Sequence, residues 1–411
     1  MKKILILSLI LALAALTPAV AEEAGTASED YAPLYPYAEA CGFRLGGAFG
    51  FWDMNNKPYM DFLARHFDSL TCTNETKAYS LLDEAASRAA EDGMPRMNYA
   101  MADKMLSWCA EHDISVRGHV LVWDAYMTDW FFREGYDSKK PYADRDTVRA
   151  RIASYIDQVV THFEQKFPGL IYCWDVVNEA IADGANEWVP DDPRHLRATR
   201  GGAPNLFLQC AGDDYVEYAF LCARNTVDAL GADIRLFYND YNLFMAGKRE
   251  AALALVDSIQ RYATDDAGAP RSLIDGIGMQ GYLGGYGEQQ GCLDPALLTQ
   301  LADSIRQYSE RGLQVQITEM AVRNFDQSRA AEHAEFYARL FTDVFVPADA
   351  GEDKPLTAVC IWGITDAPAN DTGSYVYKLN SPYGGLLTLN GKIKTSFDAM
   401  YRALVAAAGR E

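Results

Sequence analysis

The sequence has few of the features that mark metalloproteins or nucleic-acid-binding proteins. It contains six histidines and eight cysteines, without a C-x-x-C pair or a His/Cys/Asp cluster at metal-ligand spacing. Lys and Arg total 37 against 57 Asp and Glu, so the formal net charge is −20. Because an acidic surface repels phosphate backbones, we expect no nucleic-acid partner. Because no cluster has metal-ligand spacing, we also expect no metal, and we expect no other cofactor. A neutral polysaccharide is compatible with this charge.

Long apolar runs are missing after the N-terminus. Lys2 and Lys3 precede an apolar run over residues 4–16, and Ala19-Val20-Ala21 offers small residues for cleavage. This pattern predicts a signal peptide over residues 1–21 and a secreted or periplasmic protein that leaves the membrane after cleavage. A membrane anchor is the alternative interpretation, but the run is short for spanning a bilayer.

The cysteines show no apparent disulfide framework. They stand at positions 41, 72, 109, 173, 210, 222, 292 and 360. Cys173 and Cys360 lie in apolar runs, which favours small buried thiols. Cys210 and Cys222 alone are close enough in sequence to suggest a local bridge in an exported protein.

Linkers and low-complexity tracts are also missing. Residues 22–38 are acidic and contain Pro and Tyr, which predicts a mobile tail. The remainder, residues 39–408, is predicted to be a single catalytic domain, and we expect a monomer. Its length suits one large α/β barrel.

Short β-branched segments alternate with amphipathic helical stretches along this domain. The predicted strands are Phe43–Phe49, Ser69–Thr71, Ser115–Val122, Ile171–Val177, Arg235–Tyr238, Gly276–Gln280, Gln314–Thr318 and Ala358–Trp362. The predicted helices are Ala100–Glu111, Val148–Lys166, Tyr215–Leu230, Lys248–Ala263, Pro295–Arg311 and Ala330–Phe345. Strand–helix alternation predicts a parallel sheet, and eight strands fit an α/β fold of the (β/α)8 TIM-barrel type. A doubly wound open sheet has the same periodicity and remains an alternative.

Carboxylates, amides and tryptophans end the predicted strands, where a barrel carries its chemistry. They are Asn74, Glu75, Lys77, His119, Trp123, Asn178, Glu179, Asn239, Asp240, Gln280, Tyr282, Glu319, Trp362 and Asp366. Tryptophan faces stack on sugar rings and amides bond hydroxyls, so this set favours a carbohydrate ligand.

Glu179 and Glu319 each follow an apolar strand segment, where a carboxylate is costly unless it is paired or functional. Two carboxylates flanking a glycosidic oxygen suffice for hydrolysis, since one donates a proton and the other attacks the anomeric carbon. A structural ion pair is the alternative for either glutamate taken singly.

Six motifs in order give the chain a resemblance to glycoside hydrolase family 10, the retaining endo-β-1,4-xylanases, from about residue 43 to about residue 404. They are Arg117–Trp123 (RGHVLVW), Trp174–Glu179 (WDVVNE), Phe237–Asn242 (FYNDYN), Ile274–Gln280 (IDGIGMQ), Ile317–Glu319 (ITE) and Trp362–Asp366 (WGITD).

The resemblance implies a role for each matching residue. Glu179 would be the general acid/base and Glu319 the nucleophile. Asn178 would bond the sugar 2-hydroxyl. The remaining substrate-binding positions it implies are Asn74, Lys77, His119, Trp123, Gln280, Tyr282 and Trp362.

Several positions depart from the family pattern. The family has histidine at Tyr282, which bonds the nucleophile, and aspartate at Ala321, which holds that histidine. Thr73 replaces a glutamate of the glycone pocket. Asp124 and Tyr126 replace a histidine and a glutamine. We therefore hypothesise that the Tyr282 hydroxyl donates to Glu319 and lowers its pKa.

Three functions remain open from the sequence. The first is a secreted xylanase acting on xylan, a β-1,4-linked plant polysaccharide, or on its oligosaccharides. The second keeps the chemistry and changes the substrate to another β-glycan or a decorated xylo-oligosaccharide. The third is a non-catalytic sugar-binding barrel. Residues 185–212 are predicted to form a long loop that either shapes the aglycone side or only covers the barrel.

Overall fold

The computed structural model describes residues 28–284, 293–346, 354–367 and 381–409. Eight parallel strands form a closed barrel. They are β1 (Arg44–Phe49), β2 (Ser69–Cys72), β3 (Ser115–Gly118), β4 (Ile171–Asn178), β7 (Arg235–Asp240), β8 (Gly276–Met279), β10 (Gln314–Val322) and β11 (Leu356–Ile361). Because β11 pairs with both β10 and β1, the sheet closes on itself. The predicted TIM barrel is confirmed, and the open doubly wound sheet is excluded.

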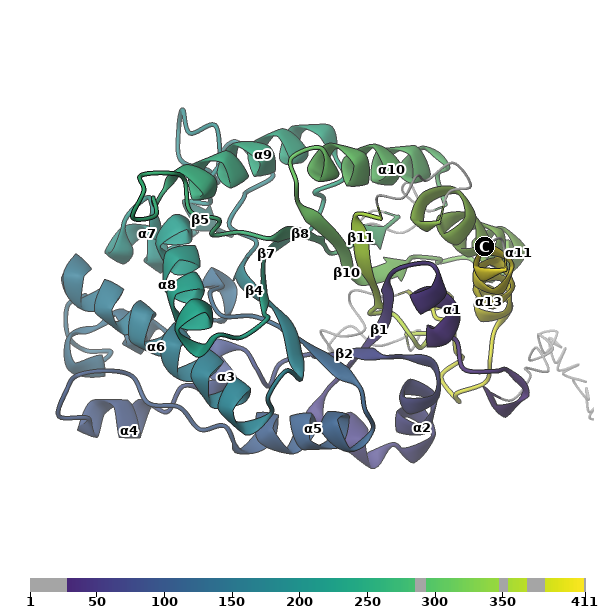
Figure 1. Ribbon diagram of the computed structural model, residues 1–411, viewed down its shortest axis with the longest axis horizontal. Coiled ribbons are helices and arrows are strands. Elements are labelled where there is room, and N and C mark those ends of the chain that lie inside the picture. Colours follow the sequence, from purple (N-terminus) through teal and green to yellow (C-terminus); the bar gives the residue numbers. More distant parts are fainter. Residues whose placement is uncertain (1–27, 285–292, 347–353, 368–380, 410–411) are drawn as a thin grey trace, which may run out of the picture.

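Helices surround the strands, as Figure 1 shows. The long ones are α2 (Lys57–His66), α5 (Ala100–Glu111), α6 (Arg145–Lys166), α8 (Tyr215–Leu230), α9 (Ala246–Arg261), α10 (Ala296–Ser309), α11 (Ala330–Arg339) and α13 (Thr395–Ala408). The predicted α5 and α8 agree with the structure residue for residue. The helix predicted over Ala330–Phe345 ends its α-helical part at Arg339 and continues as a π-helical segment, Leu340–Phe345.

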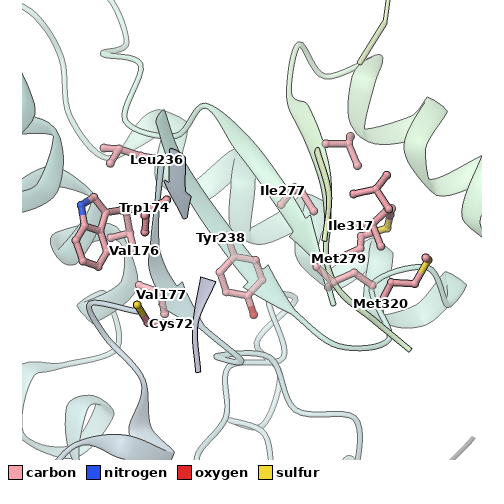
Figure 2. Packing of buried hydrophobic residues seen from close by; sticks show 14 of the residues in the cluster. Cys72, Trp174, Val176, Val177, Leu236, Tyr238, Ile277, Met279, Ile317 and Met320 are labelled. Atoms are coloured by element: carbon pink, nitrogen blue, oxygen red, sulfur yellow. The ribbon is translucent and has the colours of Figure 1, made fainter. Parts of the chain in front are cut away.

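The barrel strands are buried on both faces, as parallel strands covered by helices must be. In β4 every residue but Tyr172 is buried. Figure 2 shows apolar side chains of adjacent strands in this core, among them Val177, Tyr238, Ile277 and Ile317. This continuous burial explains why the strands read in the sequence as apolar runs without alternation.

Two strand ends differ from the prediction by four residues each, and both differences bear on the site. β3 ends at Gly118, although Leu121 and Val122 still donate backbone hydrogen bonds to β4. β10 continues to Val322, with a register irregularity between Ile317 and Met320. Glu319 therefore lies inside a strand, at this irregularity, and not after the strand's end.

The second half of the predicted tail belongs to the barrel domain. Residues 28–30 and α1 (Tyr35–Ala40) are helical, and Leu34 is fully buried. The Tyr31 ring packs edge-on against Phe397 of α13 at 5.2 Å. The prediction of a mobile tail is thus wrong for residues 28–38, because apolar residues scattered among acidic ones pack on the C-terminal helix. Residues 22–27 and the predicted signal peptide lie outside the described residues.

The cysteines that the structure describes are buried and form no disulfide with one another. These include Cys210 and Cys222, so the suggested bridge is wrong and the buried-thiol interpretation is supported; Cys292 lies outside the described residues. In the described part of the chain, no helix is long and apolar enough to cross a membrane.

Candidate active site

The residues proposed from the sequence converge on the carboxyl end of the barrel. β4 carries Asn178 at its end and Glu179 directly after it, and β10 carries Glu319. The other positions follow the ends of their strands: Asn74 and Lys77 after β2, His119 and Trp123 after β3, Gln280 after β8, Tyr282 in the short strand β9 (Tyr282–Leu283), and Trp362 after β11.

Glu319 is buried among neutral hydrogen-bond donors. Its Oε1 accepts from Asn239 Nδ2 at 3.0 Å, and its Oε2 accepts from the Tyr282 hydroxyl at 2.5 Å. Burial raises the pKa of the Glu319 carboxyl, while His119 and the Tyr282 hydroxyl oppose that rise. The geometry thus agrees with the hypothesis that Tyr282 supports the ionised form of Glu319.

Tyr282 and Ala321, two positions that depart from the family pattern, are neighbours in the structure. β9 pairs with β10 in a register that places Tyr282 opposite Ala321. Ala321 is fully buried in a small cluster with Tyr282 and Trp362. Where the family has a histidine and an aspartate, this chain has the phenol of Tyr282 packed on the methyl group of Ala321. The Tyr282 hydroxyl bonds the Glu319 carboxylate directly.

Glu179 occupies a different environment. Its backbone has φ of 55°, in the left-handed region, and its N–H donates to Asn239 O at 2.9 Å. Gln280 Nε2 donates to its Oε1 at 2.9 Å, and Arg200 Nη1 donates to its Oε2 at 3.0 Å. The Glu179 carboxylate thus has one neutral and one cationic partner.

Side-chain amides connect the two carboxylates. Asn239 Nδ2 donates to Glu319 and also to Asn178 Oδ1 at 2.9 Å. Gln280 Nε2 lies 3.3 Å from the same Asn178 oxygen and bonds Glu179. Residues of four adjacent strands, β4, β7, β8 and β10, and of the positions directly after them therefore fix both carboxylates around the Asn178 amide oxygen, an arrangement suited to two groups acting on one bond.

Lys77 stands beside the carboxylates. Its Nζ bonds Asn74 Oδ1 at 3.3 Å and lies over the rings of Trp123 and Tyr126 at 4.9 and 4.4 Å. Burial lowers the pKa of Lys77 to about 8, although Glu319 and Glu179 pull it upward. Tyr126, where the family has glutamine, thus helps to cover the lysine.

His119 is held by a buried ionic network beneath the site. Its Nδ1 lies 2.8 Å from Asp175 Oδ2, and Arg117 binds both oxygens of Asp175 at 2.7 and 3.1 Å. Burial acts to raise the pKa of Asp175, but Arg117 and His119 hold it below its usual value. The imidazole is thereby fixed with its Nε2 available for a ligand.

Three buried donors of the site have no acceptor among the described residues: Asn178 Nδ2, Trp123 Nε1 and Trp362 Nε1. Unsatisfied buried donors are costly, so their clustering is a sign of a ligand rich in acceptor oxygens. Sugar hydroxyls meet that need. The described residues contain no group of three or more His, Cys, Asp or Glu arranged to hold a metal ion.

Three residues of the site were not among the proposed ones. Asn239 had a signal, because it ends a strand within the fifth-strand motif. Asp124 was marked only as a departure from the family pattern, and nothing in the sequence marked its pairing with Arg200, which joins the 185–212 segment to the chain after β3. That segment contains the hairpin β5 (Thr199–Arg200) and β6 (Ala203–Pro204) and the helix α7 (Leu206–Ala211). It reaches Glu179, so it shapes the site and does not only cover the barrel.

Comparison with known proteins identifies the family. The model for glycosyl hydrolase family 10 matches residues 34–389. The chain belongs to glycosyl hydrolase family 10. Curated relatives include a putative endo-1,4-beta-xylanase of Caldicellulosiruptor saccharolyticus, 33% identical over 71% of this chain and 86% of the relative. Endo-1,4-beta-xylanase B of Butyrivibrio fibrisolvens is 29% identical over 89% of this chain, which spans 52% of that protein.

Solved structures of this family share the barrel. The intracellular xylanase of Thermoanaerobacterium saccharolyticum is 27% identical with a TM-score of 0.69, covering 90% of this chain and 98% of the other. An endo-1,4-beta-D-xylanase of Clostridium thermocellum, solved with xylohexaose, has a TM-score of 0.74 at 24% identity, covering 93% of this chain and 68% of the other. Membership of a glycoside hydrolase family makes the chain an enzyme and disfavours the non-catalytic sugar-binding barrel.

Proposed function

We propose that this glycoside hydrolase is an endo-1,4-β-xylanase that works by double displacement, with Glu319 as nucleophile and Glu179 as general acid/base. The observation that carries the proposal is the pair of carboxylates at one barrel mouth, joined through Asn178, Asn239 and Gln280. Several curated relatives are endo-1,4-beta-xylanases. The Thermoanaerobacterium enzyme was also solved as two single glutamate-to-alanine variants, with xylotriose and with xylotetraose.

The reaction has two steps. In the first, ionised Glu319 attacks the anomeric carbon while protonated Glu179 gives its proton to the departing glycosidic oxygen. This breaks the C–O bond and forms a glycosyl ester on Glu319. In the second, Glu179, now a carboxylate, takes a proton from water as that water attacks the same carbon and releases Glu319.

The surroundings supply what each step needs. Asn239 and Tyr282 donate to Glu319 and stabilise it as an anion before attack. Asn178 Nδ2 is free to donate to a sugar hydroxyl beside the reacting carbon. Trp123 and Trp362 offer indole N–H groups and rings to the sugars around it.

A second substrate class is favoured by specific departures. Tyr282 and Ala321 change the wall beside the nucleophile, and Thr73 and Tyr126 change the glycone pocket. The same chemistry on another β-glycan, or on a decorated xylo-oligosaccharide, therefore stands as the alternative.

We also propose that the protein acts outside the cytoplasm, as a monomer without a metal or other cofactor. The motive for export is the basic and apolar N-terminal pattern of residues 1–21, which lie outside the described residues. Its test is the N-terminal sequence of the protein secreted by its natural host, expected to begin at Glu22; a cell-retained protein starting at Met1 would contradict export.

A substrate panel tests the catalytic proposal. Reducing-sugar release is measured on xylan, mixed-linkage glucan, cellulose and mannan, and NMR identifies the first anomer formed. We expect internal cleavage of xylan and a β-anomer as first product. Release from a different glycan alone would favour the alternative substrate, and an α-anomer would overturn double displacement.

A further inference from the structure

Arg200 enters the active site from a short hairpin outside the barrel. β5 and β6 are antiparallel and joined by Gly201 and Gly202, whose φ values of 56° and 84° suit glycine. The Gly201 N–H donates to Glu187 Oε1 at 3.0 Å. The turn is thus held in a fixed place, and Arg200 stands directly before it.

Arg197 fastens the same hairpin to the chain around Glu179. Its guanidinium donates to the backbone oxygens of Glu179 and Ile181 at 3.2 and 2.9 Å. It also pairs with Glu187 Oε2 at 3.0 Å. Because the anchor is the backbone next to Glu179, the position of Arg200 relative to that glutamate is set by the fold.

The guanidinium of Arg200 bridges two carboxylates. Its Nε and Nη2 bind Asp124 in a two-pronged contact at 2.9 and 2.8 Å, and its Nη1 binds Glu179 Oε2 at 3.0 Å. The side chains of Asp124 and Glu179 are 7% and 9% exposed, so water screens these contacts weakly. Asp124, one of the departures from the family, is thus the clamp that aims Arg200 at Glu179.

Other charged groups around Glu179 come from the barrel itself. Lys77, after β2, is cationic, while Glu319 on β10 and Asp240 on β7 are acidic, and each interacts electrostatically with Glu179. Arg197 faces the Glu179 backbone oxygen. Arg200, by contrast, is a cation hydrogen-bonded to a carboxylate oxygen of Glu179, Oε2.

We propose that Arg200, clamped by Asp124, is a positioning residue that stabilises Glu179 as a carboxylate and so favours its role as base over its role as acid. The inference rests on the proposed function of Glu179. A guanidinium hydrogen-bonded to a carboxylate stabilises the anion more than the neutral acid. Arg200 therefore favours the ionised form of Glu179, which the second step uses when the glycosyl ester is hydrolysed, over the protonated form, which the first step uses.

Substrates with different leaving groups separate the two steps. Dinitrophenolate departs from 2,4-dinitrophenyl β-xylobioside without being protonated. The turnover of this substrate is therefore limited by hydrolysis of the glycosyl ester, which needs Glu179 as base. Xylohexaose has a poor leaving group, so its cleavage needs the acid. The ratio of kcat on the aryl glycoside to kcat on xylohexaose therefore reports the balance between the two forms.

The test uses two substitutions that should act in the same direction. Arg200→Met removes the cation, and we expect the ratio to fall about tenfold, the scale of one charge-assisted hydrogen bond. Asp124→Asn keeps the shape of the side chain but removes the charge that clamps Arg200, so the ratio should fall by a smaller factor. The double variant should resemble Arg200→Met, because the effect of Asp124 passes mainly through the arginine.

Arg194→Met is the matched control, since Arg194 lies in the same segment but pairs with Asp192 and Glu217. It should leave the ratio unchanged. A fall of the ratio in both site variants, larger in Arg200→Met, would support the inference. Equal changes of both substrates in both variants, or a rise of the ratio in either variant, would overturn it. A wild-type enzyme that hydrolyses neither substrate would overturn the proposed function first, and this inference with it.

Discussion

The two glutamates of the site are held in contrasting ways. Glu319 lies within a barrel strand and receives hydrogen bonds from neutral groups, Asn239 and Tyr282, on elements that belong to the barrel sheet. Glu179 follows its strand on a left-handed residue and receives a cation from a hairpin outside the barrel. The hydrogen bonds to the Glu319 carboxylate thus come from the barrel sheet, whereas those to the Glu179 carboxylate come from Gln280 after β8 and from Arg200 on the hairpin.

The contrast matches the two tasks. The nucleophile must be an anion when it attacks the anomeric carbon. Hydrogen bonds from neutral donors stabilise that anion without themselves adding a charge. An acid/base must exchange a proton in each step, so a nearby cation changes which of its two forms is favoured. The environment of Glu319 therefore affects how readily the nucleophile attacks, and that of Glu179 affects whether its acid form or its base form is favoured.

The largest effect is expected from removing the nucleophile. Glu319→Gln keeps the shape of the side chain and one accepting oxygen, and it should lower kcat on xylan by at least about 10⁴-fold, as for nucleophiles of other hydrolases. Glu332→Gln on the exposed face of α11 is the control and should be silent. A variant retaining a tenth of the activity would show that Glu319 is not the nucleophile.

Glu179→Ala should have a smaller and substrate-dependent effect. Loss of the general acid is expected to cost about 10²–10⁴-fold on xylan. Formation of the glycosyl ester from dinitrophenyl β-xylobioside should be nearly unchanged, and added azide should restore its turnover by attacking the ester. The burst of dinitrophenol and its azide dependence are the measurements; equal losses on both substrates without azide rescue would contradict the acid/base role.

Tyr282→Phe should have the smallest effect. Removing the hydroxyl takes a donor from the Glu319 anion, so the pKa of Glu319 rises further above its usual value. Because ionised Glu319 is the active form, the acidic limb of the kcat/KM profile should move to higher pH, with about a tenfold loss at the optimum. Tyr308→Phe, which loses a hydroxyl bonded to Leu243 O, is the control. An acidic limb that does not move would show that the Tyr282 hydroxyl does not lower the pKa of Glu319.

The sequence predicted the regular part of the molecule well. Parallel strands covered on both faces give apolar runs, and each run places a polar residue at the barrel mouth, so Glu179, Gln280 and Tyr282 could be found. The bond between Tyr282 and Glu319 was also foreseen, from the position two residues past Gln280. The extension of β10 past Glu319 was not, because an irregularity of register has no sequence period.

Contacts that join distant loops escaped prediction. Arg200 and Asp124 are 76 residues apart and meet because a hairpin folds back over β4. Neither residue type nor spacing marks such a pair. Residues 28–38 were misjudged for a related reason, since Leu34 is fully buried and Tyr31 packs on Phe397 of a helix at the other end of the chain.

The covalent step is the central claim, and trapping it is the most direct test. A 2-fluoro-β-xylobioside with an activated leaving group is incubated with the enzyme, and peptide mass spectrometry locates the adduct. The account predicts one glycosyl ester, on Glu319, formed in wild type and Glu179→Ala and absent in Glu319→Gln. An adduct on another residue, or turnover of xylan without any trapped ester, would contradict it.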